Sequence, residues 1–133
     1  MMADEAALLR LCVSFAERID GGHAASVTEL FTPDGVLVSG GERVSGATAL
    51  RERFTRRERE TGLVTRHLIT NASFAIQEPE RASGRMLMTV FRRHDGDTGM
   101  ALPRVADVED VYMRGVDGRW RIAQRRIEKV FGP

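Results

Sequence analysis

The imidazole of His67 is the side chain of this sequence best suited to proton transfer near neutral pH. His67 lies in residues 64–76, a stretch rich in β-branched residues and free of Gly and Pro, which predicts a long strand. Side chains alternate between the two faces of a strand. One face therefore carries His67, Ile69, Asn71, Ser73 and Ala75, a mixture typical of the wall of a pocket with a polar bottom. The other face is predicted to be an apolar packing surface formed by Leu68, Thr70, Ala72, Phe74 and Ile76.

Asp20 is the second candidate, because it stands where a carboxylate is locally unfavourable. Residues 4–20 have helical apolar spacing, with Leu8, Cys12, Phe15 and Ile19 flanked by Leu9 and Ala16, and Gly21 and Gly22 are predicted to end the helix. A carboxylate at a helix C-terminus opposes the dipole by a few tenths of a kcal/mol. Asp20 near His67 would form an acid/base pair worth roughly 10²–10⁴-fold in rate. Alternatively, Asp20 bonds to local backbone amides and His67 is a structural residue.

Other reactive side chains carry weaker signals. Cys12 is the only cysteine, so an internal disulfide and a cysteine-based zinc site are excluded, and its helical stripe predicts a small buried hydrophobe. His94, Asp95 and Asp97 lie in a glycine-rich loop without the spacing of a zinc or EF-hand site. No P-loop, dinucleotide or Gly-x-Ser-x-Gly motif occurs. We therefore expect neither a metal nor a cofactor.

Composition limits the partners that the chain is expected to have. Its 133 residues predict one domain over residues 1–133, and a net charge of +1 gives no electrostatic argument for nucleic acid or an anionic membrane. Residues 1–7 contain acidic and no basic side chains, unlike a signal peptide, and no apolar run reaches the length of about 20 residues that spans a bilayer. These two features predict a cytoplasmic protein. Nineteen of the twenty basic residues are Arg, which suggests a GC-rich bacterial genome.

The order of predicted elements indicates an α+β domain. Helices are expected over residues 4–20, 23–31 and 47–60, a turn over 32–35, and short strands over 36–38 and 42–44. Long strands are expected over 64–76, 82–93, 104–114 and 120–130, with a loop over 94–103 and a hairpin turn at Asp117 and Gly118. Three helices on one face of a curved antiparallel sheet follow from this order. The arginine-rich outer face of helix 47–60 is interpreted as a solvated face, with a binding patch as the alternative.

Four segments in this order resemble one superfamily. They are FAERIDGG at 15–22, LFTPDGV at 30–36, TRHLITN at 65–71 and DGRWRI at 117–122. They resemble the SnoaL-like branch of the nuclear-transport-factor-2-like superfamily, whose fold is a cone-shaped, cystatin-like α+β structure. The resemblance implies the fold more than the function, because the superfamily includes isomerases, dehydratases, polyketide cyclases, epoxide hydrolases, dioxygenase small subunits and plain scaffolds.

Residue by residue, the resemblance implies particular roles. Asp20 and His67 match the acid/base pair of scytalone-dehydratase-like enzymes. Asp110 falls near the second, proton-donating acid of ketosteroid isomerases, and Arg125 near a final-strand basic residue of related dehydratases. Phe15 and Val108 stand where relatives carry a catalytic or inward-facing aromatic hydroxyl, so a tyrosine donor for an oxyanion is missing there. The strand register leaves Asp107 and Glu109 as alternatives to Asp110.

Together these features lead to one hypothesis and two alternatives. We expect a cofactor-independent lyase, isomerase or cyclase for an apolar small molecule, with His67 as general base and acid, Asp20 as its partner and Asp110 as a second donor. The expected substrate pocket is formed by Phe15, Asn71, Met86, Met88, Val108, Trp120 and Arg125. A homodimer through the outer sheet face is expected from the resemblance. The alternatives are a non-catalytic ligand-binding or dimerisation module, and a small subunit that supports a larger enzyme.

Overall fold

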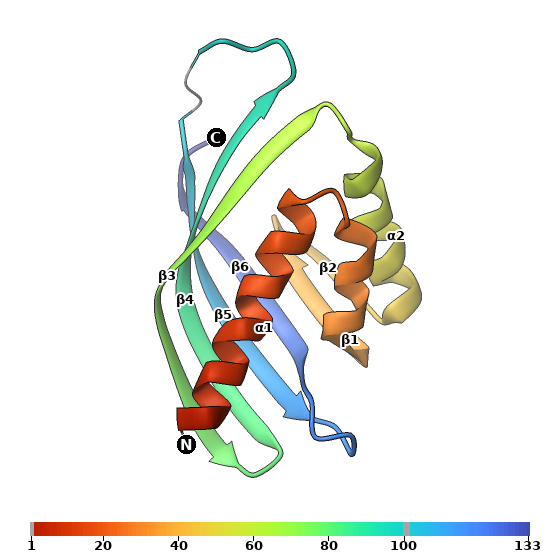
Figure 1. The fold of residues 1–133 in the computed structure, drawn as a ribbon, viewed down its shortest axis with the longest axis vertical. Coiled ribbons are helices and arrows are strands. Elements are labelled where there is room, and N and C mark those ends of the chain that lie inside the picture. Colours follow the sequence, from red (N-terminus) through yellow and green to blue (C-terminus); the bar gives the residue numbers. More distant parts are fainter. Residues whose placement is uncertain (1, 100–101) are drawn as a thin grey trace.

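The long strands of the second half of the chain form most of one curved sheet, with the helices packed beside it (Figure 1). The computed structural model describes residues 2–99 and 102–133. Within them lie α1 (Met2–Asp20), the 3₁₀ helix η1 (Ala24–Leu30), α2 (Ala47–Arg59), β1 (Phe31–Ser39), β2 (Glu42–Ser45), β3 (Leu63–Glu78), β4 (Arg81–His94), β5 (Arg104–Arg114) and β6 (Trp120–Phe131). The strands are ordered β2-β1-β6-β5-β4-β3. Every helix in this described part is too short or too polar to cross a membrane.

The α+β architecture is confirmed, but two details of the prediction are wrong. The turn expected over residues 32–35 is part of β1, whose register against β6 shifts between Phe31 and Val36. Strand β1 also runs parallel to β6, so the sheet is mixed rather than fully antiparallel. This pairing joins two segments that lie far apart in the chain, so it leaves no local sequence signal. The loop expected over 94–103 includes residues 100–101, which lie outside the described residues.

A β-bulge in the middle of β3 changes which side chains face the helices. Thr70 pairs with Leu87 and Ser73 pairs with Arg85, so two residues of β3 oppose one of β4. Asn71, in the bulge, has φ of 55°, a left-handed conformation that Asn tolerates better than most residues. Each predicted face of β3 is therefore wrong in one half: Leu68 and Thr70, expected on the apolar packing surface, are exposed, and so are Asn71, Ser73 and Ala75, expected on the pocket wall, while Phe74 and Ile76 pack against the core as predicted. The inward residues are Thr65, His67, Ile69, Phe74 and Ile76.

The helices are held to the sheet by one apolar core. Leu8, Cys12, Phe15 and Ile19 of α1 are buried as predicted, whereas Leu9 is 43% exposed on the far side of the helix. The rings of Phe15, Phe31 and Phe54 meet at centroid distances of 5.8 to 6.4 Å. Because these rings come from α1, β1 and α2, their packing fixes the C-terminal half of α1 relative to the sheet.

Candidate active site

The end of α1 is closed by a glycine motif that places Asp20 at the last helical position. Gly22 has φ of +86°, and the backbone N–H of His23 donates to the Arg18 carbonyl while that of Gly22 donates to the Ile19 carbonyl. This is the Schellman arrangement, which needs a left-handed residue after the helix. The carboxylate of Asp20 is thereby held beside the first half of β3.

Asp20 and His67 are in direct contact. The Nδ1 atom of His67 lies 2.6 Å from Oδ1 of Asp20, and the backbone N–H of His67 donates to Oδ2 over 2.8 Å. The hydroxyl of Thr65 donates to Oδ1 over 2.9 Å. A carboxylate can only accept, so Nδ1 carries the proton of the neutral imidazole and Nε2 keeps a free lone pair. The two side chains are 14% and 12% exposed, which leaves the pair accessible but largely shielded from water.

The surroundings of Asp20 keep it ionised. Desolvation by burial raises the pKa of its carboxyl group. The hydrogen bonds from the side chain and backbone of His67 and from Thr65 together lower the pKa by more than burial raises it, so the pKa lies below its ordinary value. The same donors offset the unfavourable helix dipole at this position. An Asp20 that stays ionised near neutral pH can therefore stabilise a positive charge on His67.

A second polar cluster lies deeper, between α1 and the middle of the sheet. Asp110 accepts hydrogen bonds from Arg125 Nε at 2.9 Å and Nη2 at 2.7 Å, and from the hydroxyl of Tyr112 at 2.6 Å. The sulfur of Cys12 lies 3.3 Å from that hydroxyl and 3.4 Å from Arg125 Nη2. All four side chains are buried. Cys12 is thus buried as predicted, but in polar rather than apolar surroundings, and desolvation raises the pKa of its thiol.

This arrangement differs from the role expected of Asp110. An aspartate that accepts from both Nε and Nη2 of a guanidinium is an acceptor, not the protonated donor that we predicted. Asp110 is also distant from His67. Asp110 lies beside Cys12 and His67 lies beside Asp20, and these two residues of α1 are eight positions apart, or about 12 Å along the helix axis. The ion pair with an arginine of the neighbouring strand is what the structure contains. Asp107 and Glu109, which precede Asp110 in β5, face outward.

Arg125 retains one unused donor inside the fold. Its Nη1 atom is buried without a hydrogen-bond partner among the described residues. Its guanidinium carbon lies 4.4 Å from the centre of the Phe15 ring, and Phe15 is five residues from Asp20 on the same helix. Burial lowers the pKa of Arg125, but the charge and hydrogen bonds of Asp110 raise it above its ordinary value, so the guanidinium stays charged.

The remaining predicted pocket residues fall into two groups. Phe15, Met86, Met88 and Val108 are buried on the inner face of the fold and fill its interior. Asn71 is turned outward by the bulge. Trp120 lies at the other end of α1, where its Nε1 donates to Asp4 over 3.3 Å. Asn71 and Trp120 are therefore not neighbours of His67, contrary to the prediction.

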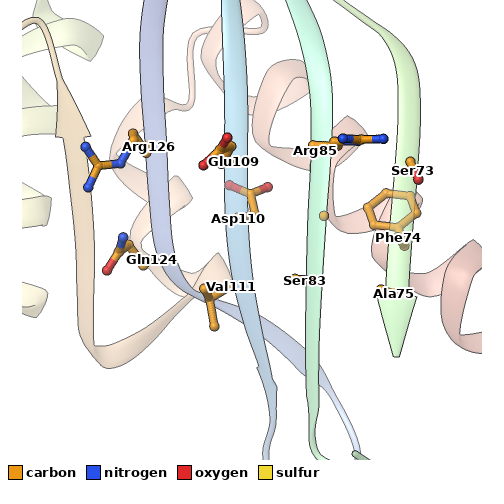
Figure 2. A pocket seen from close by; sticks show the side chains of 11 residues that line it. Ser73, Phe74, Ala75, Ser83, Arg85, Glu109, Asp110, Val111, Gln124 and Arg126 are labelled. Atoms are coloured by element: carbon orange, nitrogen blue, oxygen red, sulfur yellow. The ribbon is translucent and has the colours of Figure 1, made fainter. Parts of the chain in front are cut away.

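A groove of about 520 Å³ lies on the opposite, outer face of the sheet. Figure 2 shows Arg85, Glu109 and Arg126 on neighbouring strands of this groove. Asp110 follows Glu109 in the strand and points to the buried side. The charged groups of this outer groove are thus separated from the His67 site by the sheet itself.

Three residues near these clusters were missed in the sequence. Tyr112 stands two residues after Asp110, so both share one face of β5, a spacing that could have revealed the contact. Thr65 stands two residues before His67 and reaches the same carboxylate for the same reason. Arg57 donates to Thr65 Oγ1 over 3.0 Å, and nothing distinguished it in the sequence from the other arginines of α2. Across residues 2–99 and 102–133, no group of three or more His, Cys, Asp or Glu is placed to hold a metal ion.

Comparisons with known proteins identify the fold and the family. Solved structures that match include a candidate scytalone dehydratase from Novosphingobium aromaticivorans (16% identity, TM-score 0.87, covering 99% of this chain and 87% of the other). A nuclear-transport-factor-2-like protein with a cystatin-like fold from the same organism matches at 22% identity and TM-score 0.82 (99% and 85% covered). A Catenulispora acidiphila protein in complex with S-DNPA matches at 24% identity and TM-score 0.78 (97% and 95% covered). No curated protein matches the chain significantly. The family model of the SnoaL-like domain matches residues 1–126, so the chain belongs to the SnoaL-like domain family.

Proposed function

We propose that this protein is a cofactor-independent lyase, isomerase or cyclase that moves a proton on an apolar small molecule, with His67 as the general base and acid. The observation that carries this proposal is the 2.6 Å contact between His67 Nδ1 and Asp20 Oδ1 in a largely shielded site. It leaves Nε2 as a free base beside the interior of the fold.

In this mechanism, Nε2 of His67 removes a proton from a carbon next to a carbonyl group. The C–H electron pair passes to the carbonyl oxygen as an enolate, and the imidazole becomes an imidazolium that Asp20 stabilises. Returning the proton to a different carbon completes an isomerisation. Delivering it to a hydroxyl on the β-carbon releases water and completes a dehydration. Attack of the enolate carbon on a second carbonyl group of the same molecule closes a ring, and the imidazolium then returns its proton to the new alkoxide.

Arg125 offers a second polar contact, but to a distant part of the substrate, because it is bonded to Asp110 and Cys12, about 12 Å along α1 from Asp20. Its buried Nη1 has a hydrogen to donate and a positive charge behind it, which suits a carbonyl or anionic oxygen at the far end of the substrate. A substrate that reaches from Arg125 to His67 has to displace part of the buried interior. Met86 and Met88 are the side chains most able to adapt, because the thioether chain is unbranched and flexible.

The filled interior favours one alternative function. If Met86, Met88 and Phe15 stay in place when a ligand is present, the fold acts as a non-catalytic module that binds a partner elsewhere. The absence of a hydroxyl at Phe15 is consistent with that alternative. The same fold then uses the Asp20–His67 contact only to join α1 to β3.

A proton-abstraction assay separates the two functions. In 5-nitrobenzisoxazole, loss of the ring C–H proton to a base breaks the N–O bond and releases a coloured nitrophenolate, so no natural substrate is needed. We expect His67→Ala to lower the wild-type rate by at least about 10²-fold while the melting temperature changes little. His94→Ala, which alters an exposed histidine, is the control. A wild-type rate equal to that of His67→Ala would contradict the enzyme proposal.

A further inference from the structure

We infer that Thr65 and Arg57 are positioning residues for the Asp20–His67 pair, forming with it a hydrogen-bond chain in which donors from α2 and from the imidazole converge on the Asp20 carboxylate. This inference rests on the proposed function, since it assigns a task to residues behind the proposed base. It concerns four side chains from three different elements: α1, α2 and β3.

The direction of the chain follows from its first donor. A guanidinium has only N–H donors, so Thr65 Oγ1 must accept from Arg57 Nη2 over their 3.0 Å contact. The hydroxyl hydrogen of Thr65 is then free to point at Asp20 Oδ1, 2.9 Å away. Asp20 in turn accepts from His67 Nδ1. In this chain Arg57 only donates, Thr65 accepts once and donates once, and Asp20 only accepts, so the proton of the neutral imidazole is confined to Nδ1.

The chain also fixes the orientation of the carboxylate. Without the Thr65 hydroxyl, the carboxylate of Asp20 would be held only by the backbone N–H of His67 on Oδ2 and by the His67 ring that it is meant to orient. The carboxylate could then turn about its Cβ–Cγ bond. The Thr65 hydroxyl holds Oδ1 from a second direction. Thr65 and His67 can reach one carboxylate because they are two residues apart on the same face of β3, before the bulge.

Arg57 differs from the arginines around it on α2. Its Nη2 also donates to the Leu63 carbonyl and its Nη1 to the Glu60 carbonyl, at 3.3 and 3.4 Å. Arg57 therefore holds two things in place: the connection from α2 to β3, and the side chain of Thr65. Arg56, next to it, is exposed and forms no side-chain hydrogen bond or ion pair with the residues described. The general preference for basic residues at a helix C-terminus explains both arginines, but only Arg57 contacts the site.

The test compares variants that keep or remove single hydrogen bonds. Thr65→Val removes the hydroxyl at nearly constant volume, Thr65→Ser restores it, and Arg57→Gln removes the charged fork. We expect Thr65→Val and Arg57→Gln to lower turnover of 5-nitrobenzisoxazole by about 10-fold, as is common for residues that orient a functional imidazole. Thr65→Ser should turn over like the wild type. Arg56→Gln is the matched control and should change nothing.

A spectroscopic signature distinguishes positioning from a merely structural role. The ¹⁵N chemical shifts of the His67 ring report which nitrogen carries the proton, and this measurement needs no activity. Protonation at Nδ1 alone is expected in the wild type and in Thr65→Ser, and a mixture of tautomers in Thr65→Val. If Arg57→Gln does not fold, Arg57→Lys takes its place, because lysine keeps the charge but lacks the fork.

The outcomes separate this inference from the proposed function. If His67→Ala loses turnover while Thr65→Val and Arg57→Gln retain both wild-type turnover and a single tautomer, the positioning role is overturned and the enzyme proposal stands. If His67→Ala is as active as the wild type, the enzyme proposal fails. The tautomer measurement then still decides whether the chain orders the imidazole.

Discussion

At the scale of single residues, two carboxylates of this protein have opposite surroundings. Asp20 is bonded to an imidazole and a hydroxyl at the edge of the interior, and the imidazole of His67 has a second nitrogen that can accept a proton. Asp110 is bonded to a guanidinium, which has no acceptor, and to a phenol in the deep interior. Asp20 is therefore placed to assist proton transfer by His67, whereas Asp110 forms a fixed ion pair with Arg125.

Replacing Asp20 by Asn should destabilise the protein in a pH-dependent way. Three donors point at Asp20, and an amide offers only one acceptor oxygen, so a loss of about 1–3 kcal/mol is expected near pH 7. The pKa of Asp20 is lowered in the folded state. Its ionisation therefore contributes stability above the unfolded-state pKa, and this contribution is lost as the pH falls through the folded-state pKa.

Urea unfolding of the wild type and Asp20→Asn at a series of pH values measures this effect. The difference in unfolding free energy between the two proteins should shrink as the pH falls into the range of the Asp20 titration. Asp107→Asn, on the outer face of the sheet, serves as the control. A difference that stays constant down to the acid limit would show that the charge of Asp20 does not contribute to stability.

At the scale of elements, the sequence predicted more of the secondary structure than of its pairing. The bounds of β5 agree with the prediction, because apolar alternation and the flanking turns are local signals. The bulge at Asn71 and the parallel pairing of β1 with β6 were not predicted, since they depend on neighbours distant in the chain. The Asp20 and His67 positions followed from a glycine stop and a strand pattern. Arg57 could not be singled out, because its role comes from where α2 meets β3.

Strand β4 contains a glycine that the packing of two aromatic rings requires. A Cβ added to Gly84 would lie 2.8 Å from Phe74 Cδ1 and 2.9 Å from the Tyr112 hydroxyl oxygen. Both rings are core residues of neighbouring strands, with centroids 6.0 Å apart. Gly84→Ala should therefore destabilise the protein by about 1–3 kcal/mol through overpacking.

Thermal and urea unfolding measure the effect of Gly84→Ala. Gly62→Ala is a suitable control, since the nearest atom to its added Cβ is an Asp95 oxygen at 3.9 Å and its φ is not left-handed. The displaced Tyr112 hydroxyl would also lose its contact with Asp110. Equal stability of Gly84→Ala and Gly62→Ala would mean that the two rings move aside without cost.

At the scale of the whole molecule, the outer face of the sheet bears an apolar stripe. Leu68, Phe91 and Val130 are 45%, 40% and 52% exposed there, and the row from Leu68 through Thr89 to Val105 runs across three paired strands. Since the helices cover the other face (Figure 1), this stripe is the apolar part of the face that is open to a second copy of the chain. We propose a homodimer through it.

A charged residue in the middle of this stripe should separate the two copies. Leu68→Asp places a carboxylate in the proposed apolar interface, where an unpaired charge is strongly disfavoured, while in a free monomer the same side chain faces water. Light scattering at micromolar concentration should give twice the chain mass for the wild type and a single chain mass for Leu68→Asp. Val116→Asp, in the exposed turn between β5 and β6, should remain dimeric. A wild-type protein of single chain mass would refute the dimer, and a dimeric Leu68→Asp would place its interface elsewhere.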